Sequence, residues 1–218
     1  MGEKSKNGIG GAAKSLLAPD NCALLLIDYQ PTSFFTVQSI DRQLLINNVI
    51  GLAKVAKIFD IPTIVTTVVA DQFSGPLLPQ LTEVFPHTKP IDRSGNNPWE
   101  DNQIISEVRK IHRRKWIMAG LWTENCVALP VLSALEDGVD VYVVADACGG
   151  VTAMAHDMAM HRMIQAGAVP ITWQALMLEL QRDWARKKTA EAVNEVAKVH
   201  GGAEGQAALY AQRMVLKG

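Results

Sequence analysis

The cysteine at position 126 is the residue of this chain best placed to do chemistry. An apolar run at 116–119 ends in Gly120, and Cys126 follows a short turn, where the sequence predicts the start of a helix. Unpaired backbone N–H groups and the positive end of the helix dipole favour a thiolate there. Because the thiolate is the nucleophilic form of cysteine, we predict that Cys126 is a reactive nucleophile.

Pro130 constrains where this helix begins. Inside a helix it removes the N–H that would bond to the carbonyl of residue 126, whereas in the first turn a proline is tolerated. The helix must therefore begin close to Cys126, or be kinked at Pro130, which still leaves the thiol near free backbone groups.

Asp28 is the second candidate, because it directly follows the apolar run at 22–27. An unpaired carboxylate is rarely buried, so this position needs a reason. Asp28 can cap the following turn, helped by Gln30 and Pro31. Alternatively it can take the proton of Cys126 and later deliver it to a leaving group. The residues alone leave both interpretations open.

Arg93 is the third candidate, within a polar stretch at 89–99. It can be an ordinary exposed loop residue. A permanently charged guanidinium cannot act as a base, but it can hold Asp28 in place and stabilise a nearby thiolate. Lys89 is a weaker candidate for the same role.

The order of elements predicts how these residues meet. Strands are predicted at 22–28, 63–69, near 90–92, at 116–120, 139–145 and 169–173, and helices near 45–59, 79–85, 100–111, 126–135, 153–166 and 175–184. This alternation is typical of an α/β fold with an open parallel sheet and helices on both faces. Ligands bind such sheets at the carboxyl ends of the strands. Asp28 and Cys126 should therefore share one edge.

Composition excludes several classes of function. The net charge is −1 and the basic residues are scattered, so we expect no nucleic acid and no membrane as partner. Three widely spaced cysteines without a C-x-x-C pair indicate a reducing cytoplasm. His156 and His161 are five residues apart, which does not place them on one helix face, and no nucleotide motif is present. We expect no metal and no cofactor.

Three segments are predicted. Residues 1–18 are polar and glycine-rich without the apolar core of a secretory signal, and we interpret them as a flexible leader. Residues 19–184 form the α/β domain. Residues 185–218 form a helical arm whose thin apolar stripe is unlikely to be stable alone. The arm can pack on its own domain or on a neighbouring subunit, and we favour the subunit, which makes the arm an oligomerisation element.

The chain resembles the isochorismatase-like cysteine hydrolases, most closely their YcaC-like branch. The resemblance covers about residues 19–184, and its most specific part is the segment G-x-x-T-E-x-C-V at 120–127. The other matching segments are Leu26-Ile27-Asp28-Tyr29-Gln30, Pro62-Thr63-Ile64-Val65-Thr66-Thr67, Gly75-Pro76-Leu77, Arg93-Ser94-Gly95-Asn96, and Ala166-Gly167-Ala168 with Thr172-Trp173.

The resemblance implies a three-layer α/β/α sandwich around a six-stranded parallel sheet. It also implies a catalytic triad of Asp28, Arg93 and Cys126, with arginine where most of the family has lysine, as in the YcaC-like branch. It further implies a cis peptide between Leu121 and Trp122, and an oxyanion hole made by the backbone amides of Trp122 and Cys126. The arginine, and the lack of a D-x-H metal motif, argue against ordinary nicotinamidase activity.

The resemblance favours a cofactor-independent hydrolase of a small amide or related C–N bond, acting through a thioester. Isochorismatases proper cleave a vinyl ether without a thiol, so Cys126 favours the amide. We expect the substrate pocket to be shaped by Phe34, Phe35, Phe73 and Trp122. Relatives assemble as rings or octamers, which implies a homo-oligomer. A thiol-based sensor, a small-molecule binder without turnover and a purely structural oligomer subunit remain alternatives.

Overall fold

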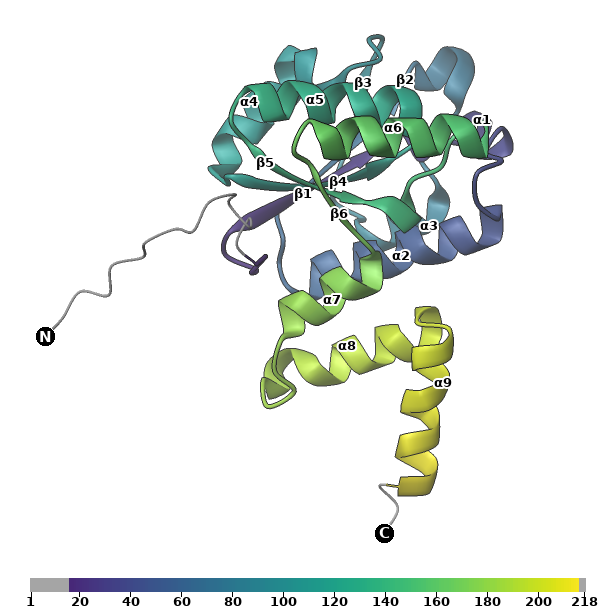
Figure 1. Cartoon of the computed structure of the whole chain (residues 1–218), viewed down its shortest axis with the longest axis vertical. Helices are drawn as coiled ribbons and strands as arrows, with labels where there is room; N and C mark the ends of the chain where they lie inside the picture. The colour runs from purple at the N-terminus through teal and green to yellow at the C-terminus, as the bar shows by residue number, and fades with distance from the viewer. Residues whose placement is uncertain (1–15, 216–218) are drawn as a thin grey trace, which may run out of the picture.

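A six-stranded sheet forms the centre of the chain, which the computed structural model describes over residues 16–215 (Figure 1). Its strands are β1 (Cys22–Ile27), β2 (Thr63–Val68), β3 (Ile91–Arg93), β4 (Lys115–Gly120), β5 (Asp140–Val144) and β6 (Val169–Ile171). They lie in the order β3-β2-β1-β4-β5-β6, and all neighbouring pairs are parallel. The predicted parallel sheet is confirmed.

Helices cover both faces of this sheet. Figure 1 shows α4, α5 and α6 on one face and α2 with α7 on the other, as in a three-layer α/β/α sandwich. The helices are α1 (Pro31–Phe35), α2 (Arg42–Ile58), α3 (Pro79–Val84), α4 (Asn102–Ile111), α5 (Ala128–Glu136), α6 (Ala153–Gln165), α7 (Trp173–Gln181), α8 (Lys187–His200) and α9 (Ala203–Tyr210). Shorter turns are η1 (Ala70–Ser74), η2 (Pro98–Glu100), η3 (Thr123–Val127), η4 (Ala145–Ala147) and η5 (Ala211–Val215).

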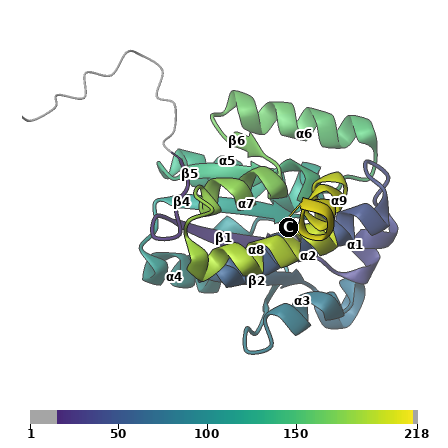
Figure 2. The same cartoon turned by 90° about the horizontal axis from the view of Figure 1, so that it is seen from below.

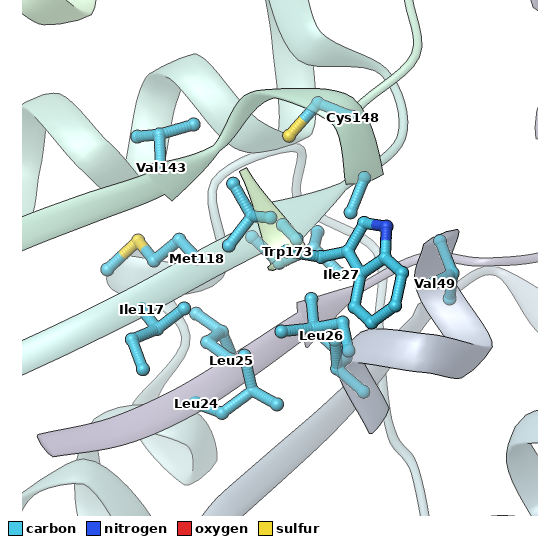
Figure 3. Packing of buried hydrophobic residues seen from close by; sticks show 14 of the residues in the cluster. Leu24, Leu25, Leu26, Ile27, Val49, Ile117, Met118, Val143, Cys148 and Trp173 are labelled. Carbon is cyan, nitrogen blue, oxygen red and sulfur yellow. The ribbon is translucent and has the colours of Figure 1, made fainter. Parts of the chain in front are cut away.

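The two central strands are buried along their whole length, which explains their continuous apolar sequences. Figure 3 shows the side chains packed between β1, its neighbours and the helices. The indole of Trp173 lies close to Leu26 and Val49 (Figure 3) and contacts α2 at Gly51, where a Cβ would come within 2.9 Å of the ring. Helix α2 can approach the indole at the start of α7 this closely because residue 51 has no side chain.

The chain first adds β2 and β3 on one side of β1 and then crosses over to add β4, β5 and β6 on the other side. A doubly wound sheet is expected to bind its ligand at this change of side, between β1 and β4. Ile27, the last residue of β1, pairs with Gly120 on β4 and with Thr66 on β2. A Cβ at Gly120 would lie 2.4 Å from the carbonyl oxygen of Ile27, so only glycine allows this approach. The register therefore aligns the ends of three strands at one edge.

The predicted flexible leader needs a correction at its end. Most of it, residues 1–15, lies outside the described residues. Leu17, in contrast, is fully buried and its backbone N–H donates to Glu179 on α7. The Nζ of Lys115 donates to the carbonyl oxygen of Leu16 at 2.7 Å. Residues 16–18 are thus part of the packed domain, because one apolar side chain and two backbone groups hold them.

The C-terminal arm also differs from the prediction. Helix α8 packs on α2 of its own domain, and the side chains of Val193, Val196 and Ala197 are buried there. The His200 ring is held by Asn47 Oδ1 at 3.0 Å and Lys54 Nζ at 2.9 Å. The preference for a neighbouring subunit is therefore wrong for α8, whose apolar stripe faces its own domain.

Helix α9 and the turn η5 extend away from the domain at its lower end (Figure 1), and in the view from below they lie across α8 (Figure 2). Their first turn is anchored to α7, since Gln174 Nε2 donates to Glu204 Oε2 at 3.0 Å. No helix of the described chain is both long enough and apolar enough to cross a bilayer.

Candidate active site

The carboxylate of Asp28 is fully buried at the end of β1. Its backbone has φ 55°, in the left-handed region that a non-glycine residue adopts at some cost, and the side chain leaves the strand there. Both carboxylate oxygens are occupied. Oδ1 accepts from Arg93 Nη1 at 2.7 Å and from Thr66 Oγ1 at 2.9 Å, and Oδ2 accepts from Arg93 Nη2 at 2.6 Å.

Arg93 reaches Asp28 because β3 is the third strand of the same edge, with Val68 of β2 paired to Arg93. Its guanidinium is buried, forms a two-pronged ion pair with Asp28, and donates a further bond to the carbonyl oxygen of Thr67 at 3.0 Å. The Arg93 Nε is buried and has no hydrogen-bond partner among the described residues. The loop interpretation of Arg93 is therefore wrong, and the structure brings Arg93 and Asp28 together.

The thiol of Cys126 lies beside this ion pair and is only 5% exposed. Its sulfur is within hydrogen-bonding reach of the Asp28 carboxylate and accepts a hydrogen bond from the backbone N–H of Trp122. Burial and, after it, the negative charge of Asp28 raise the pKa of the Cys126 thiol to about 12, while Arg93 acts in the opposite direction. Desolvation and the neighbouring carboxylate thus outweigh the backbone groups that favour a thiolate at this position.

The helix begins close to Cys126, as predicted. Cys126 lies in η3, a wide helical turn that continues directly into α5 at Ala128. Pro130 then occupies the first turn of α5, as its missing N–H requires. The thiol is therefore held in the first turn of a continuous helical stretch.

The turn before Cys126 carries the backbone groups that face the sulfur. The peptide bond between Leu121 and Trp122 is cis, at the position that the resemblance implies. The N–H of Thr123 donates to the carbonyl oxygen of Gly149 at 3.0 Å. The indole Nε1 of Trp122 donates to Ser33 O at 3.1 Å and to Thr36 Oγ1 at 2.9 Å, which ties helix α1 to this turn.

The four aromatic residues expected to shape a pocket lie on three neighbouring segments, because α1 contacts η1 and the Trp122 indole bonds to α1, but they differ in burial. Phe34 is buried and packs on Tyr29, with ring centroids 6.0 Å apart. Phe35 is 73% exposed and Phe73 is 66% exposed, so in the single chain both point to solvent. Of the four residues, Trp122 alone has a described contact with Cys126, which its backbone N–H makes. Phe34 and Phe35 are adjacent on a helix, where successive side chains point about 100° apart, so one can face the core while the other faces solvent.

Several residues of the site were not singled out from the sequence. Thr66 and Thr67 hold Asp28 and Arg93 through a hydroxyl and a carbonyl. Both lie in the matching segment at 62–67, so the resemblance contained a signal for them. Glu124 accepts the backbone N–H of Val151 at 3.0 Å, and this contact depends on a loop that no local pattern predicts.

Other ionisable groups nearby do not form a metal site. Within residues 16–215, no group of three histidine, cysteine or acidic side chains is arranged to hold a metal ion. His156 Nδ1 contacts Thr123 Oγ1 at 2.8 Å, and burial lowers the pKa of His156. Cys148 is buried, and burial raises the pKa of its thiol to about 12. Cys22 is likewise buried at the other end of β1, and its thiol pKa is raised to about 11.

The isochorismatase domain model matches residues 22–175, most of the chain. The chain belongs to the isochorismatase family. A probable hydrolase, YcaC of Escherichia coli, is 41% identical over 169 residues, which cover 77% of this chain and 81% of that protein. This similarity places the chain in the YcaC-like branch of the family and supports a hydrolase.

Solved YcaC structures superimpose over nearly the whole isochorismatase-family chain. The E. coli protein, described as an octameric hydrolase of unknown specificity, has a TM-score of 0.88 and 33% identity, and the match covers 94% of this chain and all of that one. YcaC from Pseudomonas aeruginosa with hexane-2,5-diol and covalent acrylamide has a TM-score of 0.87 and 34% identity, over 93% of this chain and all of that one.

The Asp28 carboxylate should control the reactivity of the Cys126 thiol. Asp28→Asn removes the negative charge that raises the pKa of the thiol and leaves the cationic Arg93 in place. We expect alkylation of Cys126 by iodoacetamide at mildly alkaline pH to accelerate about tenfold, the effect of one pKa unit on the thiolate fraction. The rate is measured by mass spectrometry of the Cys126 peptide.

Thr66→Val is the matched control, because it removes a hydrogen bond to the same carboxylate without changing the charge. Its alkylation rate should stay close to that of the wild type. An equal rate in Asp28→Asn and the wild type would show that the carboxylate does not act on the sulfur, and a rate below the wild-type rate would show that it acts as the base and not through its charge.

Proposed function

We propose that this isochorismatase-family hydrolase cleaves a small amide or related C–N bond through a thioester on Cys126. The observation that carries the proposal is the contact between the Cys126 sulfur and the buried Asp28 carboxylate, which Arg93 holds with two hydrogen bonds. A carboxylate within hydrogen-bonding reach of a thiol can take its proton, which is the geometry that general-base catalysis requires.

The first half of the reaction transfers the thiol proton to Asp28 as the sulfur attacks the carbonyl carbon. The transfer turns a thiol and a carboxylate into a thiolate and a carboxylic acid, with the Arg93 charge unchanged. The net charge of the buried site therefore stays constant, which avoids the cost of creating a lone buried charge. The backbone N–H groups of Trp122 and Cys126 are proposed to bind the carbonyl oxygen as it becomes negative, worth about 3 kcal/mol per donor.

The second half releases an amine or ammonia, which takes the proton from Asp28 as the C–N bond breaks. A water molecule then gives its proton to Asp28 and attacks the thioester, and Cys126 regains its proton as the acid product leaves. Asp28 thus acts as base and acid in turn. Arg93 is proposed to hold the Asp28 carboxylate in place between steps through its two hydrogen bonds, at the position where most of the family has lysine.

The raised thiol pKa favours this hydrolase over a peroxide sensor. Redox-sensor cysteines are exposed thiolates of low pKa, whereas Cys126 is buried with a pKa of about 12. A relative that carries covalent acrylamide supports an amide-sized ligand, since acrylamide is itself a small primary amide that reacts with thiols. A small-molecule substrate, no nucleic-acid partner and a cytoplasmic location remain predictions.

Amide hydrolysis can be tested without knowing the natural substrate. Purified protein is incubated with a panel of small primary amides, and the released ammonia is measured. The mass of the intact protein is measured in parallel to detect an acyl-enzyme. We expect release from at least one amide, together with a mass increase equal to its acyl group. Cys126→Ala should lose both signals and keep its melting temperature.

Cys22→Ala is the matched control, because it removes another buried thiol at the opposite end of β1 and should leave turnover unchanged. Ammonia release that persists in Cys126→Ala would rule out a thioester intermediate on Cys126. Alkylation of Cys126 without release from any amide would favour a binder without turnover.

We further propose that the protein is a homo-oligomer and that the outer part of the C-terminal arm contributes to its contacts. The octameric E. coli relative supports an oligomer. Helix α9 and η5 expose Tyr210, Met214 and Val215, which are large apolar side chains on a segment with little support from its own domain. A groove of about 540 Å³ between α8 and the segment of α9 and η5 is lined mainly by charged and polar side chains, with three alanines among them.

Shortening the arm tests this assignment. Deleting residues 208–218 removes the exposed part of α9 but keeps the anchored first turn and the α8 contact with α2. We expect a smaller sedimenting species, while the melting temperature of the domain changes little. Leu44→Ser, which removes an exposed leucine from α2, should sediment like the wild type. An unaltered profile for the shortened chain would exclude the arm as an assembly element.

A further inference from the structure

The turn that carries Trp122 rests on a second segment, Cys148-Gly149-Gly150-Val151. Leu121 and Gly149 form an isolated parallel bridge, and the N–H of Thr123 donates to the Gly149 carbonyl oxygen at 3.0 Å. The position of the Trp122 N–H, which points at the Cys126 sulfur, therefore depends on where residues 149–151 lie.

The Glu124 carboxylate connects this second segment to the turn that carries the nucleophile. Glu124 lies two residues before Cys126, and its Oε1 accepts the backbone N–H of Val151 at 3.0 Å. Its Oε2 is buried without a hydrogen-bond partner among the described residues. That oxygen lies against the backbone of Gly150, where a Cβ would come within 2.6 Å of it. A side chain at position 150 would therefore force the carboxylate to move.

The same segment is fixed from its other side by the loop before α2. The N–H of Gly150 donates to Ser39 Oγ at 2.9 Å, and the Gly150 carbonyl oxygen accepts the N–H groups of Gln38 and Ser39 at 3.0 and 3.3 Å. Glu124 is therefore the link between an anchored segment and the turn that carries the nucleophile. A buried carboxylate oxygen left without a partner costs free energy, which a purely structural contact would not require.

We propose that Glu124 is a positioning residue for the oxyanion hole. It acts through Gly149–Val151 on the turn at 121–123 and so aims the Trp122 N–H at the carbonyl oxygen of the substrate. It has no described contact with Asp28 or Arg93, so it should affect stabilisation of the oxyanion and leave the reactivity of the thiol unchanged. This inference rests on the proposed acyl transfer to Cys126.

Two thiol reagents separate these effects. Acylation by p-nitrophenyl acetate passes through an oxyanion: the sulfur bonds to the acetyl carbon, the ester C–O bond breaks, nitrophenolate leaves, and Asp28 takes the thiol proton. Alkylation by iodoacetamide displaces iodide and forms no oxyanion. The ratio of the two rates at Cys126, with the Cys126→Ala signal subtracted, therefore reports the oxyanion hole.

We expect Glu124→Ala to lower the acylation rate by about tenfold or more, a part of the loss seen when an oxyanion donor is removed, and to leave alkylation within about twofold. Glu124→Gln keeps an oxygen acceptor for the Val151 N–H and should recover most of the acylation rate. Glu136→Ala, at the far and exposed end of α5, is the matched control and should behave like the wild type.

Equal acylation in Glu124→Ala and the wild type would overturn the inference, as would a parallel fall in acylation and alkylation, which indicates general damage to the turn. A wild type that is alkylated but never acylated would overturn the proposed acyl transfer itself and the inference with it. The two failures are therefore distinguishable by the wild-type measurement.

Discussion

The buried ion pair between Asp28 and Arg93 is the interaction on which the site depends. Both side chains are almost completely withdrawn from water, and two hydrogen bonds of 2.6 and 2.7 Å join them. Burial of either charge alone would be strongly unfavourable, and loss of one partner from such a pair costs about 3–5 kcal/mol. The pair is possible because the parallel register brings the ends of β1, β2 and β3 to one edge.

This arrangement determines the character of the thiol. Burial of the sulfur and, after it, the charge of the neighbouring carboxylate suppress the resting thiolate and raise the pKa of Cys126 to about 12. The same carboxylate is the group to which the proton can move during reaction. The site therefore protects a neutral thiol at rest and forms the thiolate only when the carboxylate is neutralised, which suits a hydrolase better than a sensor that must react unassisted with oxidants.

Much of the fold was predictable because its signals are local. Continuous apolar runs such as that at 22–27 mark buried parallel strands, and the alternation with amphipathic segments predicts the layers. Asp28 and Cys126 were placed at one edge by the same reasoning. The role of Arg93 could not be decided from the local sequence, because only the pairing of the short β3 with β2 turns its side chain inward.

The errors come from long-range contacts. Desolvation of Cys126 depends on everything packed around it, so the favourable backbone groups of its turn could not predict its pKa. The docking of α8 on α2 includes the contacts of His200 with Asn47 and Lys54, from which His200 is 153 and 146 residues away in the sequence. The same holds for Leu17 on α7 and for Glu124 on Val151, where the partners follow from the tertiary fold alone.

The protonation state of Cys126 tests the account most directly. The S–H stretching band of this residue is isolated as the infrared difference between the wild type and Cys126→Ala near neutral pH. The account predicts a clear S–H band at rest, because burial and Asp28 keep the proton on sulfur, and its loss when the thiol is acylated. A folded wild type without that band near neutral pH would carry a preformed thiolate and would contradict the account.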